Sequence, residues 1–415
     1  MLKKNYVKSK LPLEFFIAVR YLKSQRKVFF SLLTTLIAVG GTTLGVAALV
    51  ITLSVMTGFQ TSIRAKILSV QPHLFITRVD GHAFRDYERI AGIISENQNV
   101  THVSPFIFAQ TVLRNVETGG TSGALIKGVN FETENKMFGL SQRIQDVYGQ
   151  GLTSLGEGEI VLGSELARSL FVMAGDEIVL MFPTEMGQMP RMQKLTVAGI
   201  MRTGMFEYDN TLTLVDIESL GNFLHFEGAV SGLGAVVANA NRAQIVADEL
   251  DLVLGHPYSV RSWTDMNRNL FFAFQLEKIM MFIILAIIIL VAAFNIVSNL
   301  LLLSTQKAKD IGILSALGYP KAKISKIFFY EGLIVGTIGT TLGLILGLGI
   351  SLFLKNFEII QLPPGVYFVD RLPVMIVPFD LFLVAGCAFI ITVASGIYPA
   401  YQVSKLDPLE AIRYG

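Results

Sequence analysis

Long apolar runs near both ends of the chain, with one large polar stretch between them, dominate the pattern of this sequence. The first run, 28–59, contains no charged residue. At roughly 1.5 Å per residue it would form a helix about 48 Å long, well beyond a roughly 30 Å hydrocarbon core, so we expect the excess to project as a stalk. Three further runs lie at 279–303, 327–354 and 378–401. The pattern predicts a polytopic α-helical membrane protein with four transmembrane helices, arranged one plus three.

The stretch 60–270 has a different pattern, in which charges return and short β-type runs alternate with turns. The β-type runs are HLFIT, TVLRNV, ALIKGV, EIVLG, EIVLMF, KLTVAGI, TLTLV and LGAVVA. Helix-like stretches lie between them, at Asp86–Glu96, Ser164–Phe171, Asp216–Phe226 and Arg242–Leu254. Mixed elements of this kind predict a large α+β domain of about 210 residues between the first and second transmembrane helices.

Small and polar residues inside the apolar runs predict close helix contacts. Gly41 and Gly45 form a GxxxG pair in the first run, and Asn295 lies in the second. In the third run, small residues recur three or four positions apart at Gly332, Gly336, Gly339, Gly343 and Gly347. We expect these faces to pack against other helices.

Composition supports a membrane protein and argues against an enzyme. The chain is 52% hydrophobic and 16% charged, which is too apolar for a soluble protein of 415 residues. Its single cysteine, Cys387, excludes an intramolecular disulfide and a cysteine metal cluster, and the five histidines have no metal-ligand spacing. The string nearest to a P-loop, Gly123–Asn130, lacks the required lysine and serine or threonine. We predict no catalytic residue, no metal site and no nucleic-acid partner.

Residues 1–27 are strongly basic, and we predict that they contain a cytoplasmic interfacial helix. The spacing i, i+3, i+4, i+7 links Phe15, Ala18, Val19 and Leu22. One apolar face would then lie on an anionic membrane leaflet. A disordered basic tail fits residues 1–10 better than 12–24.

The distribution of basic residues predicts the orientation of the chain. Residues 1–27 and the loop 304–326 are basic, whereas the loop 355–377 has no net charge. By the positive-inside rule, the N-terminus, the loop 304–326 and the tail 402–415 are cytoplasmic. The domain 60–270 and the loop 355–377 then lie on the other side of the membrane.

The basic loop Ser304–Lys326 has a helical pattern of its own. Ile311, Leu314 and Leu317 recur at helical spacing, and Gly318 and Pro320 end the pattern. An ordinary positive-inside loop is the alternative, but a helix this short needs a surface on which to bury its apolar stripe, either headgroups or a partner protein.

Glu331, near the start of the third apolar run, is an ionisable group close to the cytoplasmic interface. A proton relay and an ion pair with a nearby lysine are the two interpretations of such a residue. We favour the ion pair.

Several strings give this chain a resemblance to a known family. Thr43–Phe59 and Val291–Ser298 resemble the first and second spans of LolC/LolE-type lipoprotein-releasing ABC permeases, within the wider MacB/FtsX-like permease family. Lys309–Gly318 resembles the coupling segment of that family, which contacts a separate ATPase. Tyr398–Pro399–Ala400 and the segment from Pro408 to Arg413 resemble the family's chain end. The similarity covers essentially the whole chain.

This resemblance implies the transmembrane subunit of a lipoprotein-releasing complex in a Gram-negative inner membrane, with the large domain in the periplasm. It implies a LolD-like ABC ATPase, a second LolC/LolE-like permease or a copy of this chain, a LolA-like periplasmic chaperone, a lipoprotein substrate and membrane lipids. ATP and Mg would be bound by the partner ATPase, so no cofactor is expected in this chain. The alternative is a MacB/FtsX-like permease that relays ATPase work to an extracytoplasmic partner without moving lipid.

The resemblance also implies site residues. The ATPase-coupling residues would be Lys309, Asp310, Ile311, Gly312, Ile313, Leu314, Leu317 and Gly318. The string Phe182–Gln193 resembles the protruding loop of LolC that docks the chaperone, which predicts contacts from Pro183, Met186, Gly187, Met189, Pro190 and Arg191. Packing of these methionines on their own domain is the alternative. For the lipoprotein acyl-chain path, the candidates are Met56, Phe59, Phe274 and Met281.

Overall fold

The computed structural model describes residues 12–23, 28–182, 191–357 and 371–403. The chain divides into two compact units. The first lies within Met1–Phe59, Gln275–Ile360 and Leu372–Gly415 and is helical, and the second contains Gln60–Phe274 and is built on a sheet.

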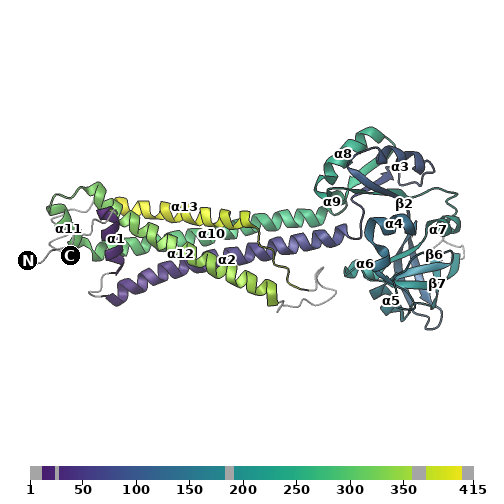
Figure 1. Ribbon diagram of the computed structural model, residues 1–415, viewed down its shortest axis with the longest axis horizontal. Helices are drawn as coiled ribbons and strands as arrows, with labels where there is room; N and C mark the ends of the chain where they lie inside the picture. The colour runs from purple at the N-terminus through teal and green to yellow at the C-terminus, as the bar shows by residue number, and fades with distance from the viewer. Residues whose placement is uncertain (1–11, 24–27, 183–190, 358–370, 404–415) are drawn as a thin grey trace, which may run out of the picture. The chain divides into compact units, whose positions relative to one another are not determined.

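Helices build the first unit (Figure 1). They are α1 (Leu13–Lys23), α2 (Val28–Leu68), α10 (Arg268–Gln306), α11 (Ala308–Ala316), α12 (Lys321–Phe357) and α13 (Pro378–Val403). The four long helices among them, α2, α10, α12 and α13, contain the apolar runs of the sequence. Residues 60–68 of α2 and 268–274 of α10 belong to the second unit.

Three stretches of the described residues are long and apolar enough to cross a membrane: Leu36–Leu68, Lys321–Phe357 and Pro378–Gln402. The predicted second span, 279–303, lies within the 39-residue helix α10, whose described apolar segment is the shorter Ala293–Leu302. A count of four transmembrane helices therefore stays a prediction.

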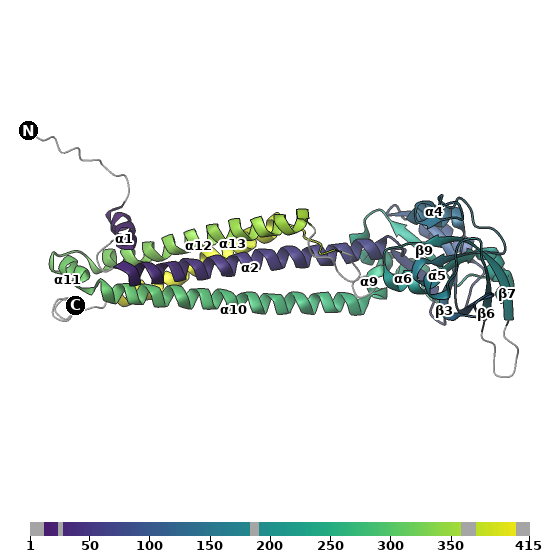
Figure 2. The same ribbon diagram turned by 90° about the horizontal axis from the view of Figure 1, so that it is seen from below.

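Small residues let α12 lie close to α2 and α13, which run beside it (Figure 2). A Cβ atom added at Gly339 would lie 2.8 Å from Cβ of Thr42, and one at Gly343 would lie 2.6 Å from Cβ of Val46. A Cβ atom at Gly336 would overlap Thr392 of α13. The close packing predicted for the glycine face of this helix is confirmed.

The GxxxG pair of α2 faces α10. A Cβ atom at Gly41 would lie 2.9 Å from Nδ2 of Asn295, and one at Gly45 would lie 3.2 Å from Cγ2 of Ile288. Asn295 thus turns its amide toward a neighbouring helix, as predicted for a polar residue within an apolar run.

A single ten-stranded sheet organises the second unit, in the order β10-β1-β9-β2-β3-β8-β5-β7-β4, with β6 paired to β2 and β7. The strands are β1 (Leu74–Arg78), β2 (Val100–Asn115), β3 (Thr121–Val129), β4 (Ile144–Gln145), β5 (Glu159–Gly163), β6 (Glu177–Phe182), β7 (Arg191–Met201), β8 (Leu212–Asp216), β9 (Gly232–Val237) and β10 (Tyr258–Ser262). The pairs β3–β8 and β5–β7 are parallel, and the other pairs are antiparallel.

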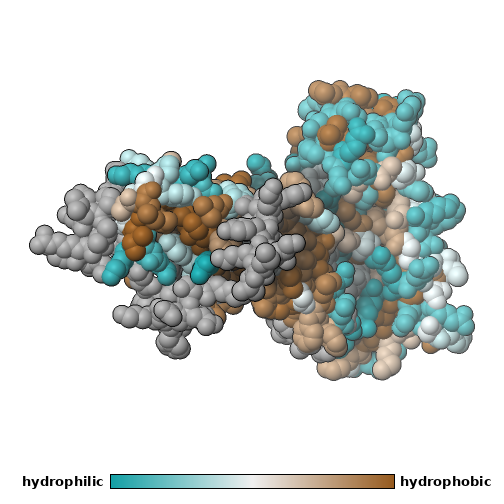
Figure 3. Space-filling view, turned by 60° about the vertical axis from the view of Figure 1, so that its left-hand side comes forward, coloured by the Kyte–Doolittle hydropathy of each residue, from teal (hydrophilic) through white to brown (hydrophobic). Residues whose placement is uncertain are grey.

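The sheet has an apolar core on each face, because successive strand residues point to opposite sides. On β5, Ile160 and Leu162 belong to one buried cluster and Val161 to the other. The helices of the unit are α3 (Tyr87–Ser95), α4 (Phe131–Phe138), α5 (Ser164–Leu170), α6 (Phe206–Thr211), α7 (Ile217–Leu224), α8 (Ala243–Leu254) and α9 (Trp263–Met266). Hydrophilic residues cover much of the visible face of this unit (Figure 3).

A buried ion pair ties α4 to the sheet. Lys127 of β3 donates to Glu134 of α4, and their side chains are only 7% and 5% exposed. The Lys127 Nζ atom also lies 5.9 Å from the ring centroid of Phe108 and 5.7 Å from that of Phe138. Together these contacts compensate the lysine charge for the loss of water.

Candidate functional site

The corner between α10 and α12 contains the predicted coupling segment. Helix α11 is nine residues long, and Gly318 ends this stretch at φ +82° before α12 begins at Lys321. Glycine adopts this left-handed conformation at low cost, so the sequence can turn sharply here. The short helix predicted within Ser304–Lys326 is confirmed.

The apolar stripe of α11 is divided between the protein's own core and the exposed surface. Ile311 is buried with Ile324 and Phe328 of α12, and Leu314 packs against the same cluster. Ile313 and Leu317 are 47% and 78% exposed. The expectation that Ile311 belongs to a stripe open to a partner is therefore wrong, because its side chain seats α11 on α12.

The other predicted coupling residues surround this exposed pair. Lys309, Asp310 and Gly318 are exposed, whereas Gly312 is buried beside Ile311. The surface that the structure leaves open for a partner thus consists of Lys309, Asp310, Ile313, Leu317 and Gly318, which we call the α11 outer face.

Helix α1 packs on the same corner. Ala18 is fully buried in the α12 cluster, and Phe15 meets Tyr330 edge to face at 5.7 Å. Lys323 of α12 lies 3.8 Å from the Glu14 carboxylate. The expectation that Ala18 would face the leaflet is wrong, since this side of α1 is occupied by α12.

Glu331 of α12 has no ion-pair partner in this corner. Its side chain is fully buried, and neither carboxylate oxygen has a hydrogen-bond partner. One of the nearby lysines, Lys307, lies 3.8 Å from the Asp310 carboxylate instead. Within the described residues, the predicted ion pair of Glu331 is therefore not found.

The remaining candidate residues lie elsewhere. Pro183, Met186, Gly187, Met189 and Pro190 fall outside the described residues, which end at Phe182 and resume at Arg191. Phe182 and Arg191 are the last residue pair between β6 and β7, and the Arg191 guanidinium donates to the Phe223 carbonyl at 3.3 Å. The 183–190 segment thus connects two paired strands.

The acyl-path candidates are all partly buried. In the first unit, Met56 and Phe59 lie on α2 and Met281 lies on α10. Phe274 belongs to the second unit, where its ring meets Phe271 at 5.9 Å.

An aromatic junction in the second unit was not predicted. Trp263 is 1% exposed, and its ring meets Phe271 edge to face at 4.9 Å. The Arg64 guanidinium of α2 lies 4.9 Å from the centre of the Trp263 ring. Through its two contacts, Trp263 of α9 links Arg64, near the end of α2, to Phe271, near the start of α10. The one tryptophan of the chain was the signal that could have located it.

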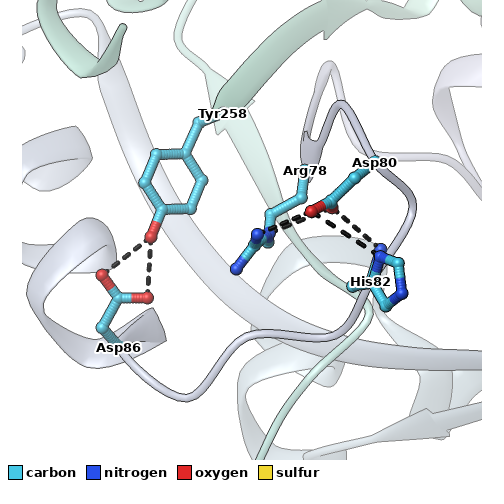
Figure 4. Close-up of polar contacts among 5 residues, drawn as sticks. All are labelled: Arg78, Asp80, His82, Asp86 and Tyr258. Carbon is cyan, nitrogen blue, oxygen red and sulfur yellow. Dashed lines mark hydrogen bonds and ion pairs between the residues drawn. The ribbon is translucent and has the colours of Figure 1, made fainter. Parts of the chain in front are cut away.

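A polar cluster on the second unit contains residue types found in catalytic sites, but its groups are engaged with one another (Figure 4). The Tyr258 hydroxyl lies 2.7 Å from both Asp86 oxygens, and Arg78 donates to Asp80 through two nitrogens. The Arg78 guanidinium and the His82 backbone N–H lower the pKa of Asp80 to about 2. Across the described residues, no group of three or more His, Cys, Asp or Glu side chains is arranged to hold a metal ion.

Two family descriptions together cover most of the chain. Residues 35–252 match the MacB-like periplasmic core domain, and residues 282–408 match the FtsX-like permease C-terminal domain. The matches define the class: a permease with a MacB-like periplasmic core between its helices.

Full-length relatives narrow this class. The lipoprotein-releasing system transmembrane protein LolC of Neisseria meningitidis is 33% identical over 97% of this chain and 99% of its own length. LolC of Xylella fastidiosa is 31% identical over the same shares, and LolE of Haemophilus influenzae is 29% identical over 96% of this chain and 98% of its own. The chain belongs to the LolC/LolE family of permeases.

Proposed function

We propose that this chain is the transmembrane subunit of a lipoprotein-releasing ABC complex. Full-length similarity to LolC and LolE carries this conclusion. A partner ATPase would hydrolyse ATP, and lipoproteins would leave the inner membrane for a periplasmic chaperone. Four transmembrane helices, with both termini in the cytoplasm, complete this proposal.

Energy would enter through the α11 outer face. Its exposed Ile313 and Leu317 are the apolar groups that an ATPase can bury, and Ile311 connects them rigidly to α12. Helices α2 and α10 each have residues in both units, so a displacement of either helix can reach the periplasmic unit. We propose that the complex contains two permease subunits, either this chain with a second LolC/LolE-like one or two copies of this chain.

The energy is required because acyl chains must leave lipid. Each buried CH₂ group contributes about 0.8 kcal/mol to membrane binding. We propose Met56, Phe59, Phe274 and Met281 as contacts of the departing chains, since each is a large apolar residue on one of the two long helices. An apolar acceptor must then receive the chains, which is the role proposed for the chaperone.

Reconstitution tests the function. Proteoliposomes containing this chain, its ATPase, its partner permease and an acylated lipoprotein should release the lipoprotein when ATP and a soluble chaperone are added. Without ATP or chaperone, the lipoprotein should stay with the vesicles. ATP hydrolysis that relays movement to an outer partner but releases no lipoprotein would favour the mechanotransmission alternative.

The proposed orientation has a direct test. In a Cys387→Ala background, a cysteine at Gly119, in the exposed β2–β3 turn, should react with a membrane-impermeant thiol reagent from the periplasmic side. A cysteine at the cytoplasmic Ser315 should react only after the inner membrane is opened. The opposite labelling pattern would overturn the orientation and the function built on it.

The chaperone contact is proposed for the segment 183–190 together with Arg191. Proline fixes φ, which lowers the entropy lost on docking, and methionine side chains adapt to apolar surfaces. We expect a Gly/Ser replacement of 184–190, which keeps the Phe182–Arg191 pair, to abolish chaperone pull-down while ATPase assembly persists. If binding to a stably folded variant is undiminished, the docking role belongs to the other permease subunit.

A further inference from the structure

Glu331 is an unusual residue for the apolar interior of the first unit. Its side chain is 0% exposed, and both carboxylate oxygens lack a hydrogen-bond partner. One turn earlier on α12, Ile327 and Phe328 are buried among apolar side chains. A carboxylate in such a place is strongly unfavourable without a counter-charge, and acids within spans commonly serve a function.

Among the described charged groups, Lys307 is the cation that acts electrostatically on Glu331. In this structure its Nζ atom lies 3.8 Å from the Asp310 carboxylate and 5.1 Å from the centre of the Tyr21 ring. A separation of 3.8 Å is too long for a hydrogen bond, and the Asp310 side chain is half exposed, so this ion pair is weak. Lys307 therefore pairs only weakly with Asp310, which is near water. The carboxylate of Glu331, in the interior, has no partner and is the second acid on which the Lys307 charge acts.

The position of Lys307 in the chain makes its side chain sensitive to movement of α11. Helix α10 ends at Gln306 and α11 begins at Ala308, so Lys307 is the single residue between them. Its φ of −100° and ψ of 9° lie outside the helical range, and its side chain makes no capping hydrogen bond. A displacement of α11 relative to α10 must change the backbone at this residue.

We propose that Lys307 and Glu331 form a latch that couples α11 to α12. In the arrangement of this structure, Lys307 pairs with Asp310. When the ATPase displaces α11, the ammonium group leaves Asp310 and pairs with Glu331 in the interior. Glu331 is thereby a positioning residue that holds α11 in its displaced state. This inference rests on the proposed role of α11 as the ATPase contact.

Amine labelling of the intact complex tests the latch without requiring lipoprotein release. Lys307 should be acylated by a water-soluble amine reagent in the nucleotide-free complex, and about tenfold less when the ATPase is trapped with ADP and vanadate. Lys321, which is exposed at the start of α12, supplies the reference in the same sample. In Glu331→Gln, the protection of Lys307 should disappear. Equal labelling of wild type in both states, or equal protection in Glu331→Gln, overturns the proposal.

A double-mutant cycle tests whether the two residues act as a pair. Glu331→Gln and Lys307→Met should each reduce the lipoprotein released per ATP hydrolysed by about tenfold, and the double variant should be no worse than either. Thr340→Val is the matched control, because Thr340 is a second buried and unpartnered polar residue of α12. It should leave release per ATP unchanged.

The outcomes of these experiments separate the two proposals. Independent losses that multiply in the double variant, or an equal loss in Thr340→Val, show a structural role and contradict the latch. Normal labelling changes in a complex that releases no lipoprotein would leave the latch standing and overturn the proposed function. A Glu331 carboxyl that stays neutral in every state would show no protection of Lys307 and would contradict the latch.

Discussion

Replacing both Ile313 and Leu317 by aspartate should abolish co-purification of the ATPase while the permease still inserts and folds. Both side chains lie on the α11 outer face, and Leu317 is 78% exposed, so neither change opens the protein's own core. An aspartate buried without a partner at the centre of an interface is expected to weaken binding by about 2 kcal/mol or more at each position. Pull-down with a tagged ATPase measures the effect.

Two further variants make this experiment decisive. Leu252→Asp alters an even more exposed apolar residue, on α8 of the second unit, and should not affect ATPase binding. Leu314→Asp should instead destabilise the permease, because Leu314 packs against the cluster around Ile311. If the Ile313/Leu317 variant binds its ATPase and releases lipoprotein normally, α11 is not the coupling element.

Replacing Glu134 by alanine should destabilise the periplasmic unit by about 3–5 kcal/mol. The change leaves the Lys127 ammonium buried among Phe108 and Phe138 without its carboxylate. Since about 1 kcal/mol shifts the melting temperature of a domain of this size by roughly 2–4 °C, the expected fall is on the order of 10 °C. The fluorescence of Trp263, the only tryptophan and a buried one in this unit, reports the transition.

A paired replacement provides the control for this prediction. Lys127→Met combined with Glu134→Leu removes both charges and keeps apolar volume at the site, so it should recover most of the lost stability. A melting temperature as low as that of the single variant would mean that the ion pair is required for reasons other than charge compensation. No change in the single variant would contradict the buried pair itself.

The hydrophobic pattern predicted those elements that are rich in apolar residues. The run EIVLG became β5, which is buried on both faces, and the helix-like stretch Asp216–Phe226 became α7 (Ile217–Leu224). Strand β10, with the sequence YSVRS, was missed because its polar residues obscure the alternation, although Val260 and Ser262 are buried. Helix α4 was missed because five of its eight residues, FETENKMF, are polar or charged.

Helix ends and site geometry depended on contacts that no local pattern contains. The apolar run of the first span ends at Phe59, but α2 continues to Leu68 because Ile63 and Ile67 are buried in the second unit. The sequence also placed Ile311 and Leu317 on one stripe, whereas packing against α12 buries the first and leaves the second exposed. Whether Ile311 and Leu317 are buried or exposed thus depends on α12, a helix that follows later in the chain.

The pairing of β1 with β10 has a consequence for the synthesis of the protein. Leu74 pairs with Ser262 and Arg78 with Tyr258, so one edge of the first strand stays unpaired until the last strand has been synthesised. Contacts this distant in sequence close late in folding. During translation, the unit therefore cannot complete its sheet until the 184 residues that follow Arg78, up to Ser262, have emerged. Helix α10 then begins at Arg268. Completion of the sheet and the emergence of the second long helix thus become consecutive steps in the synthesis of the chain.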